Sequence, residues 1–363
     1  MKLTAKIFIG ILLSGTLSIS SFAQKSYTYS PPQTLNDGWS TEHLFNDSTD
    51  SALVYGLFNQ LVTVKHKVHS ALLIHKGNLV LEEYYGDYGI NDQHDLRSTT
   101  KSVRSLLLGI AIDKGFIEDI DDPIQKYVKT PVAKKNVDER KQAITIRHLL
   151  TMSSGLDCND WDKKSRGQED KVYKKKNWLQ FTLDLPMIND PGEVAAYCSM
   201  GVVLATEAIR QASGMEIDEF AHRYLFEPLG ISNMSWGHTS KRKNIPSSAK
   251  RLYMTPRDMA KIGMLILNDG TWGQKQIISK EWIDEATTSH TQITGIDYGF
   301  WWWNIPFGTY TSISATGNGG QYIFVIPELD MVAVFTGGAY NSQDDKLPFG
   351  IVNNIFIPTI TGK

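Results

Sequence analysis

The stretch DLRSTTK at residues 95–101 decides the fold, because it runs directly into an apolar segment at residues 103–112. The apolar segment predicts a helix, and a spacing of three residues places Ser98 and Lys101 on one face of it. The helix N-terminus adds unpaired N–H groups and a partial positive charge beside the Ser98 hydroxyl. This arrangement favours a serine nucleophile, and hence a hydrolase that works through an acyl-enzyme.

The Ser-x-x-Lys spacing is not specific by itself, because it also occurs at residues 240–243 and 247–250. Both of these stretches are polar and basic and lack apolar periodicity, so we interpret them as solvated loop. Of the three serines, Ser98 alone opens an apolar helix.

The composition is that of an ordinary globular protein, with 41% hydrophobic and 21% charged residues in a chain of 363. Lysine and arginine together number 37, against 39 aspartate and glutamate residues. This balance gives no reason to expect nucleic acid or an acidic membrane surface as a partner.

The N-terminus is typical of an export signal. Two lysines flank the start of an apolar run at residues 7–19, and residues 21–23 (SFA) place small side chains where a signal peptidase reads them. The run is too short and too polar for a membrane anchor, which needs about 20 continuous apolar residues. We therefore expect a cleaved signal peptide at residues 1–23, an exported protein that is periplasmic or secreted, and no stable membrane anchor after cleavage.

The two cysteines, Cys158 and Cys198, invite pairing in an exported protein. A disulfide would close a loop of about 40 residues, which is worth about 3–4 kcal/mol in the chain-entropy model. Two reduced, partly buried thiols are the alternative, because sequence separation does not show whether the two side chains face each other.

The order of predicted elements is strands, helices, strands and a closing helix, without an alternating βα repeat. We expect strands at residues 70–75, 79–85, 298–303, 311–315, 321–326 and 331–336. This order predicts an α+β fold, in which both ends of the chain complete an antiparallel sheet flanked by helices and a mostly helical region is inserted.

The expected parts are an extended N-terminal arm at residues 24–50, an α/β domain with the antiparallel sheet at residues 51–97 and 271–363, and a mostly helical domain at residues 98–270. Within the helical part, residues 157–177 carry many charges. They are interpreted either as a functional lid or as a solvated insertion.

A serine nucleophile needs a base and donors for the oxyanion. Lys101 is the nearest base, provided that it is neutral or shares a proton with a second group. Tyr197, in a turn before a helix at residues 200–212, is the candidate for that group, although a buried aromatic at a helix start is the alternative. The segment GNGGQ at residues 317–321 either permits close backbone approach to a ligand or encodes a simple hairpin turn.

These three segments, in this order, resemble the serine β-lactamase and penicillin-binding-protein superfamily, which is marked by Ser-x-x-Lys, Tyr-x-Asn and a Lys-Thr-Gly-type strand. The likeness is greatest to its class C-like branch, which includes esterases, D-amino-acid peptidases and 6-aminohexanoate-oligomer hydrolases. It covers roughly residues 55–357 and extends to ITIRHLLTMSSGL at 144–156, DDPI at 121–124 and TPRDMA at 255–260. The implied fold is β-lactamase/transpeptidase-like.

By this resemblance Ser98 matches the acylated serine, Lys101 the lysine that helps to deprotonate it, and Tyr197 the tyrosine that relays the proton to the leaving group. The Lys-Thr-Gly triplet matches residues 318–320, and the backbone N–H groups of Ser98 and Gln321 would form the oxyanion hole. The implied oxyanion- and substrate-binding residues are Ser199, Asn318, Gly319, Gly320 and Gln321.

Two departures from the family pattern concern the substrate. Ser199 replaces the Asn of Tyr-x-Asn, whose amide usually contacts the acyl amide of the substrate. Asn318 replaces the Lys that binds the carboxylate of a β-lactam or a D-alanyl peptide. Since the acylation residues remain, the resemblance implies a serine hydrolase that cleaves ester or amide bonds of small substrates. The alternatives are a β-lactamase or D-amino peptidase acting on cell-wall peptides, and a non-catalytic binder of those peptides.

Other chemistries lack their motifs. The chain has no Gly-x-Ser-x-Gly elbow, no His-Glu-x-x-His and no phosphate loop. His66 and His69 have a spacing that suits a metal, but no third ligand accompanies them. We expect neither a metal nor a cofactor, and the sequence leaves the oligomeric state open.

Overall fold

The computed structural model describes residues 26–45, 51–238 and 245–362. The expected signal peptide at residues 1–23 and the Ser-x-x-Lys spacing at residues 240–243 lie outside this part of the chain. No helix in the described ranges combines the length and the apolar composition that a bilayer span requires.

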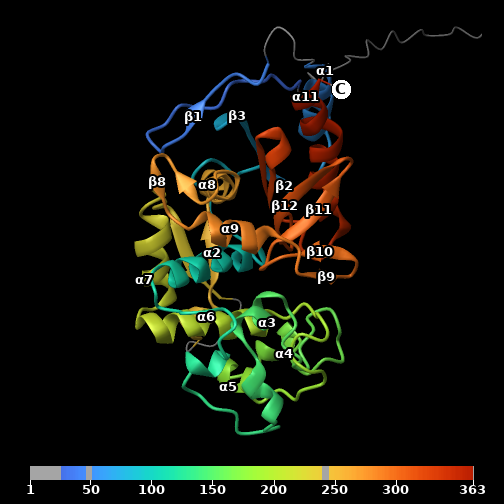
Figure 1. The fold of residues 1–363 in the computed structure, drawn as a ribbon. Coiled ribbons are helices and arrows are strands. Elements are labelled where there is room, and N and C mark those ends of the chain that lie inside the picture. The colour runs from blue at the N-terminus through green and yellow to red at the C-terminus, as the bar shows by residue number, and fades with distance from the viewer. Residues whose placement is uncertain (1–25, 46–50, 239–244, 363) are drawn as a thin grey trace, which may run out of the picture.

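A nine-stranded sheet forms the scaffold, and its strands follow the order β1-β3-β2-β14-β13-β12-β11-β10-β9. The strands are β1 (Ser40–Thr41), β2 (Val68–His75), β3 (Asn78–Tyr84), β9 (Thr291–Ile293), β10 (Ile296–Tyr298), β11 (Trp303–Phe307), β12 (Tyr310–Gly317), β13 (Gln321–Ile326) and β14 (Met331–Gly337). Neighbours pair in antiparallel fashion except β1, which runs parallel to β3. In Figure 1 the N-terminal strands lie beside the C-terminal ones, so the predicted α+β arrangement is confirmed.

The central strands are buried on both faces, which explains their nearly continuous apolar sequence. One face packs on α1 (Ala52–Thr63) and on the closing helices α10 (Leu347–Ile351) and α11 (Ile357–Thr361). The other face packs on α8 (Pro256–Leu267), where a side chain at Gly263 would overlap Val332. This glycine therefore lets α8 approach β14 closely.

Helix α2 (Thr99–Asp113) joins the sheet to the inserted helical region. It contacts β12 and β13 on one side and α6 on the other, as Figure 1 shows. The remaining helices are α3 (Ile146–Leu150), α4 (Glu169–Val172), α5 (Trp178–Leu183), α6 (Ser199–Ser213), α7 (Ile217–Ala221) and α9 (Lys280–Thr287). A small sheet of β4 (His94–Asp95), β6 (Arg251–Met254) and β5 (Met234–Gly237) fixes the segment that leads into α2, and β7 (Thr271–Trp272) and β8 (Lys275–Gln276) form a separate hairpin.

The strand expected at residues 298–303 is wrong, because β10 ends at Tyr298 and β11 begins at Trp303. Between them the chain turns, and Trp301 adopts a φ of 63°. Its indole N–H donates to the Leu149 carbonyl at 3.0 Å, and its own carbonyl accepts from Ser102 at 2.6 Å. Anchoring to two helices therefore outweighs the strand preference of the aromatic residues.

Residues 247–250 are not the solvated loop that their polar, basic composition predicts. Ser247, Ser248 and Ala249 are buried against α6. Ser248 Oγ donates to Glu207 at 2.9 Å, and Ser247 Oγ donates to Glu216. The carboxylates that satisfy these hydroxyls lie more than 30 residues away in sequence, so local composition does not reveal them.

Candidate active site

Ser98 stands at the sharp junction between β4 and α2. Arg97, directly before it, adopts a left-handed φ of 51°, which is uncommon for a residue other than glycine. This turn places the Ser98 hydroxyl at the mouth of the cavities that lie between the sheet and the helical region. Strained backbone of this kind is often found where a side chain must be held for chemistry.

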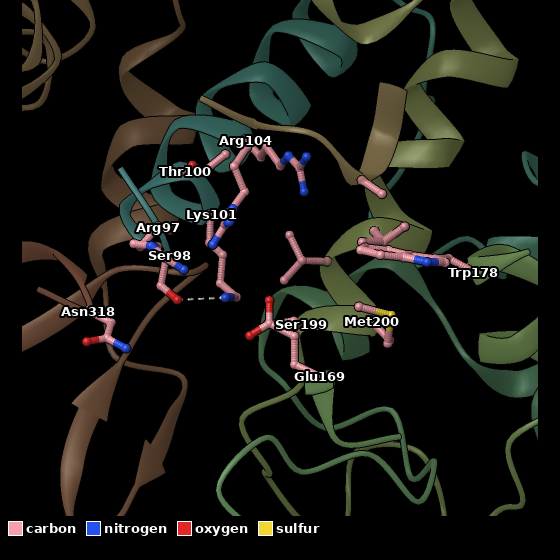
Figure 2. Close-up of a pocket in the computed structure, with 14 residues that line it drawn as sticks. Arg97, Ser98, Thr100, Lys101, Arg104, Glu169, Trp178, Ser199, Met200 and Asn318 are labelled. Carbon is pink, nitrogen blue, oxygen red and sulfur yellow. Dashed lines mark hydrogen bonds between the residues drawn. The ribbon is translucent and has the colours of Figure 1, made fainter. Parts of the chain in front are cut away.

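Lys101 lies one turn further along α2 and donates a hydrogen bond from Nζ to Ser98 Oγ at 2.9 Å, drawn as a dashed line in Figure 2. Its residue exposure is 7%, and burial by itself lowers a lysine pKa. The negative charges that Tyr197, Glu169 and Asp160 can carry outweigh burial and raise the pKa of Lys101. The raised pKa of Lys101 disfavours the sequence-based option of a neutral lysine base, which leaves the option of a proton shared with a second group.

Tyr197 reaches the same place from the turn before α6. Its ring lies 4.8 Å from Lys101 Nζ, measured to the ring centroid. The Tyr197 carbonyl accepts from the Asp160 backbone N–H at 2.8 Å, and Asp160 Oδ2 accepts from the Ser199 backbone N–H at 2.9 Å. The turn is thus held in place by the loop at residues 157–177.

A disulfide between Cys158 and Cys198 joins that loop to the start of α6. Asp160 lies two residues after Cys158, and its two partners, Tyr197 and Ser199, lie on either side of Cys198. The covalent link and the hydrogen bonds therefore fix the same segment. The loop is therefore part of the site wall rather than a solvated insertion.

Two carboxylates on this loop face the catalytic lysine. Asp160 and Glu169 both line a polar cavity beside Ser98, and Figure 2 shows the Glu169 carboxylate turned towards the Lys101 ammonium. Burial raises the pKa of Asp160 to about 6, although the charge of Lys101 acts in the opposite direction. The charges of both carboxylates help to raise the pKa of Lys101.

The hairpin between β12 and β13 closes the site on the side of the sheet. A side chain at Gly317 would lie 2.3 Å from the Leu96 carbonyl oxygen and 3.1 Å from Thr99 Oγ1. Glycine here lets the strand pass directly against the start of α2. Thr316, Gly317 and Asn318 line a cavity of about 450 Å³ together with Ser98.

The predicted hairpin residues divide between the site and the interior. Asn318 lines the cavities, and its side-chain amide both donates to and accepts from Asn341, at 2.8 and 2.9 Å. Gln321 is fully buried instead, and its side chain donates to the Gly337 carbonyl at 2.6 Å. Gly319 and Gly320 form the turn with φ values of 97° and 96°. Residues 316–318 are thus the part of the hairpin that lines the cavity with Ser98, while the Gln321 carbonyl accepts from Thr99 Oγ1 at 3.0 Å.

The large cavity is lined mainly by apolar and aromatic side chains. Trp161 stacks on Tyr197, with ring centroids 4.8 Å apart, and the Trp303 ring lies beside both, at 5.9 Å from Tyr197 and 6.3 Å from Trp161. Ile296, Ile305 and Phe349 complete the apolar lining. Such a surface suits an uncharged chain or ring attached to a reacting carbonyl.

Sequence reasoning missed Asp160, Trp161, Glu169 and Trp303 as site residues. The first three lie in the charged stretch 157–177, and nothing local distinguishes them from solvated residues. The signal that was available was Cys158, since its pairing with a cysteine next to Tyr197 brings this stretch to the site.

Comparisons with known proteins agree with this geometry. The model of the family described as Beta-lactamase matches residues 59–348. A 6-aminohexanoate-dimer hydrolase from Paenarthrobacter ureafaciens is 24% identical over 293 residues, which cover 73% of this chain and 71% of that protein.

Solved structures show the same fold. The octameric penicillin-binding protein homologue from Pyrococcus abyssi aligns with a TM-score of 0.63 at 20% identity, over 86% of this chain and 77% of that one. EstCE1, a hydrolase with promiscuous acyltransferase activity, aligns with a TM-score of 0.68 at 15% identity, over 84% of this chain and 98% of that one. Because the family model spans most of the sequence and the fold agrees, the chain belongs to the β-lactamase family, in its class C-like branch.

Proposed function

We propose that this protein hydrolyses ester or amide bonds of small substrates through an acyl-enzyme on Ser98. The observation that carries the proposal is the 2.9 Å hydrogen bond from Lys101 Nζ to Ser98 Oγ, with the Tyr197 ring 4.8 Å from the same ammonium. A nucleophile, a shared-proton base and a cavity for the substrate thus meet at one hydroxyl.

In the first half-reaction, Ser98 transfers its proton to the pair formed by Tyr197 and Lys101 as its oxygen attacks the carbonyl carbon. The ammonium of Lys101 stays beside Ser98 Oγ and Tyr197, where it stabilises the negative charge that the transfer creates. The pair then returns the proton to the leaving group, and the acyl group remains on Ser98.

In the second half-reaction a water molecule attacks the acyl-enzyme, and the same pair takes its proton. Ser98 leaves with that proton and the acid is released. Since residues 316–318 are the part of the hairpin next to Ser98, we assign the second oxyanion donor to the backbone of Asn318, in place of Gln321.

The lining of the site favours simple esters and amides over β-lactams and cell-wall peptides. Asn318 carries no charge, and its amide is held by Asn341, so the position of the family lysine offers no cation for a substrate carboxylate. The large cavity offers aromatic and aliphatic surface instead. We expect turnover of p-nitrophenyl butyrate and little turnover of nitrocefin.

The test is the variant Ser98→Ala together with labelling by a fluorophosphonate probe. Wild-type protein should hydrolyse p-nitrophenyl butyrate and take up the probe at Ser98, as located by mass spectrometry, and the variant should do neither. Ser248→Ala, which alters a buried serine away from the cavities that Ser98 lines, is the matched control and should retain both activities. Hydrolysis that persists in Ser98→Ala, or rapid nitrocefin turnover by the wild type, would contradict the proposal.

A further inference from the structure

A second, smaller cavity opens from Ser98 in the other direction, between α2 and α6. Its volume is about 90 Å³, and Figure 2 shows it in close-up. Four cationic side chains line it: Arg97, Lys101, Arg104 and Arg251. Among the described residues that line it, Glu169 is the one acid. This charge balance differs from that of the large apolar cavity.

Arg104 is the centre of this cationic lining. It follows Lys101 by three residues on α2, so both side chains point into the same space. Its exposure is 4%, one N–H donates to the Lys250 carbonyl, and Nε is buried without a hydrogen-bond partner. Burial lowers the pKa of Arg104 to about 9, and no neighbouring carboxylate in the described structure opposes that effect.

A buried guanidinium without an anion is unusual, because the cost of removing a charge from water is normally offset by a paired charge. The acid that lines the cavity does not fill this role, since Glu169 acts on Lys101. The free N–H of Arg104 therefore points to an anion that comes from outside the chain.

The other two arginines add to the surplus of positive charge. Arg97 and Arg251 both pair with Asp95, at 3.2 and 3.3 Å, so two guanidinium groups share one carboxylate. The Nε of Arg251 is also buried without a hydrogen-bond partner.

Ser199 supplies a further donor. Its exposure is 6% and it lines the same cavity. Its hydroxyl has no partner at normal hydrogen-bond distance among the described residues, although it lies close enough to the Asp160 carboxylate to lower the pKa of that acid. At this position the family has an asparagine, whose amide contacts the substrate. The shorter serine leaves space in front of Arg104, and its hydroxyl can donate to an anion in that space.

The size of the cavity limits the anion to a small group. A water molecule needs roughly 10–15 Å³ measured in this way, so the space holds a few non-hydrogen atoms. Ser98 and Arg104 are six residues apart on one helix, about 9 Å along its axis. A planar carboxylate matches the fork of a guanidinium, and a chain of about three methylenes would connect it to a carbonyl at Ser98.

We propose that this cavity is a carboxylate subsite, in which Arg104 and Ser199 bind the terminal carboxylate of an acyl group whose carbonyl reacts at Ser98. The preferred substrates are then monoesters or monoamides of short dicarboxylic acids. The inference rests on the proposed acyl-enzyme at Ser98 and adds its acyl specificity. Asn318, at the family position whose lysine binds the substrate carboxylate, also lines this cavity, but the carboxylate binds Arg104 and Ser199 instead.

The test compares two esters of nearly the same shape. Monomethyl glutarate carries a carboxylate where methyl 5-methylhexanoate carries an isopropyl group, and hydrolysis of both is followed by acid release. We expect wild-type kcat/KM to favour the glutarate ester and Arg104→Met to shift the ratio of the two values by roughly 10- to 100-fold towards the neutral ester. Arg104→Lys should show an intermediate ratio. Arg223→Met, at an exposed arginine, is the matched control and should leave the ratio unchanged.

Product inhibition gives a second readout that does not depend on folding of a variant. Free glutarate should compete with the neutral ester at a concentration at least roughly ten times lower than 5-methylhexanoate does. Equal inhibition by the two acids, or the same ratio in wild type and a folded Arg104→Met, would overturn the subsite. If instead neither ester is hydrolysed and Ser98 takes up no probe, the proposed function itself has failed.

Discussion

The rings of Trp161 and Tyr197 lie parallel, with centroids 4.8 Å apart and an angle of 4° between their planes. Trp161 belongs to the charged loop and Tyr197 to the turn before α6. The disulfide between Cys158 and Cys198 joins these two segments, and Cys198 directly follows Tyr197. The stack covers one face of the Tyr197 ring, whose centroid lies 4.8 Å from Lys101 Nζ. The loop thereby contributes a wall of the large cavity.

We predict that Trp161→Ala weakens substrate binding without unfolding the protein. Trp161 is 54% exposed, so its removal changes the stability little, but the stack on Tyr197 and part of the cavity wall are lost. Stacked pairs contribute about 0.5–1.5 kcal/mol, so KM for p-nitrophenyl butyrate should rise roughly 3- to 10-fold. Trp161→Phe should recover most of the loss. Unchanged KM in Trp161→Ala would show that the wall does not contact the substrate.

Tyr197→Phe should abolish most of the activity while preserving the fold. The phenylalanine keeps the ring that packs on Trp161 and Trp303 but removes the oxygen to which we assign proton transfer with Lys101. General acid–base catalysis typically accounts for a factor of about 10² to 10⁴, so kcat should fall within that range. The measurement is kcat for p-nitrophenyl butyrate beside a thermal melting curve. A variant of wild-type activity would exclude Tyr197 from proton transfer.

The buried carboxylate of Asp160 should make stability depend on pH in a defined window. Its pKa is raised from 3.8 to about 6 in the folded state, chiefly by burial, so the folded protein binds this proton more tightly than the unfolded chain. The free energy of unfolding therefore falls as pH rises from about 4 to about 6, by up to about 3 kcal/mol from this group.

Asp160→Asn removes that titration while its side-chain oxygen can still accept the Ser199 N–H. Urea unfolding of the wild type and the variant from about pH 4 to about pH 7 gives the difference between their free energies of unfolding at each pH. Because the other acids are present in both proteins, the pH dependence of this difference reports the titration of Asp160. The variant should gain stability relative to the wild type as pH rises through the window. Two parallel profiles would contradict the raised pKa of Asp160.

The sequence was sufficient for the sheet and for the start of α2, because both depend on local patterns. Apolar runs buried on both faces marked β13 and β14, and the spacing of Ser98 and Lys101 on one helix put their side chains 2.9 Å apart. It was not sufficient where a distant partner decides the outcome. Trp301 leaves the strand pattern to bond Leu149, and Ser248 is buried because Glu207 accepts its hydroxyl.

The candidate site shows the same division. Tyr197 follows from family resemblance, whereas Asp160, Trp161 and Glu169 reach the site only through the covalent link of Cys158 to Cys198. The unpaired charge of Arg104 could not be predicted from the sequence, because it depends on the distances of carboxylates from Arg104 in the folded protein. The special position of Gly317 was not predicted, because the glycines at 317, 319 and 320 look equivalent in sequence until the packing against Leu96 distinguishes Gly317.

Gly317→Ala should therefore lower the activity and the stability, although it adds only one methyl group. The added methyl group would lie 2.3 Å from the Leu96 carbonyl oxygen, so either the hairpin or the start of α2 must move. Overpacking typically costs about 1–3 kcal/mol, and a displaced Asn318 backbone should lower kcat at least roughly 10-fold. Gly56→Ala on α1 is the matched control, because its methyl group meets nothing within 4 Å and a helical alanine should stabilise the protein by about 0.5–1 kcal/mol. Urea unfolding and p-nitrophenyl butyrate turnover should separate the two variants, and similar behaviour of both would show that close passage of β12 against α2 is not required.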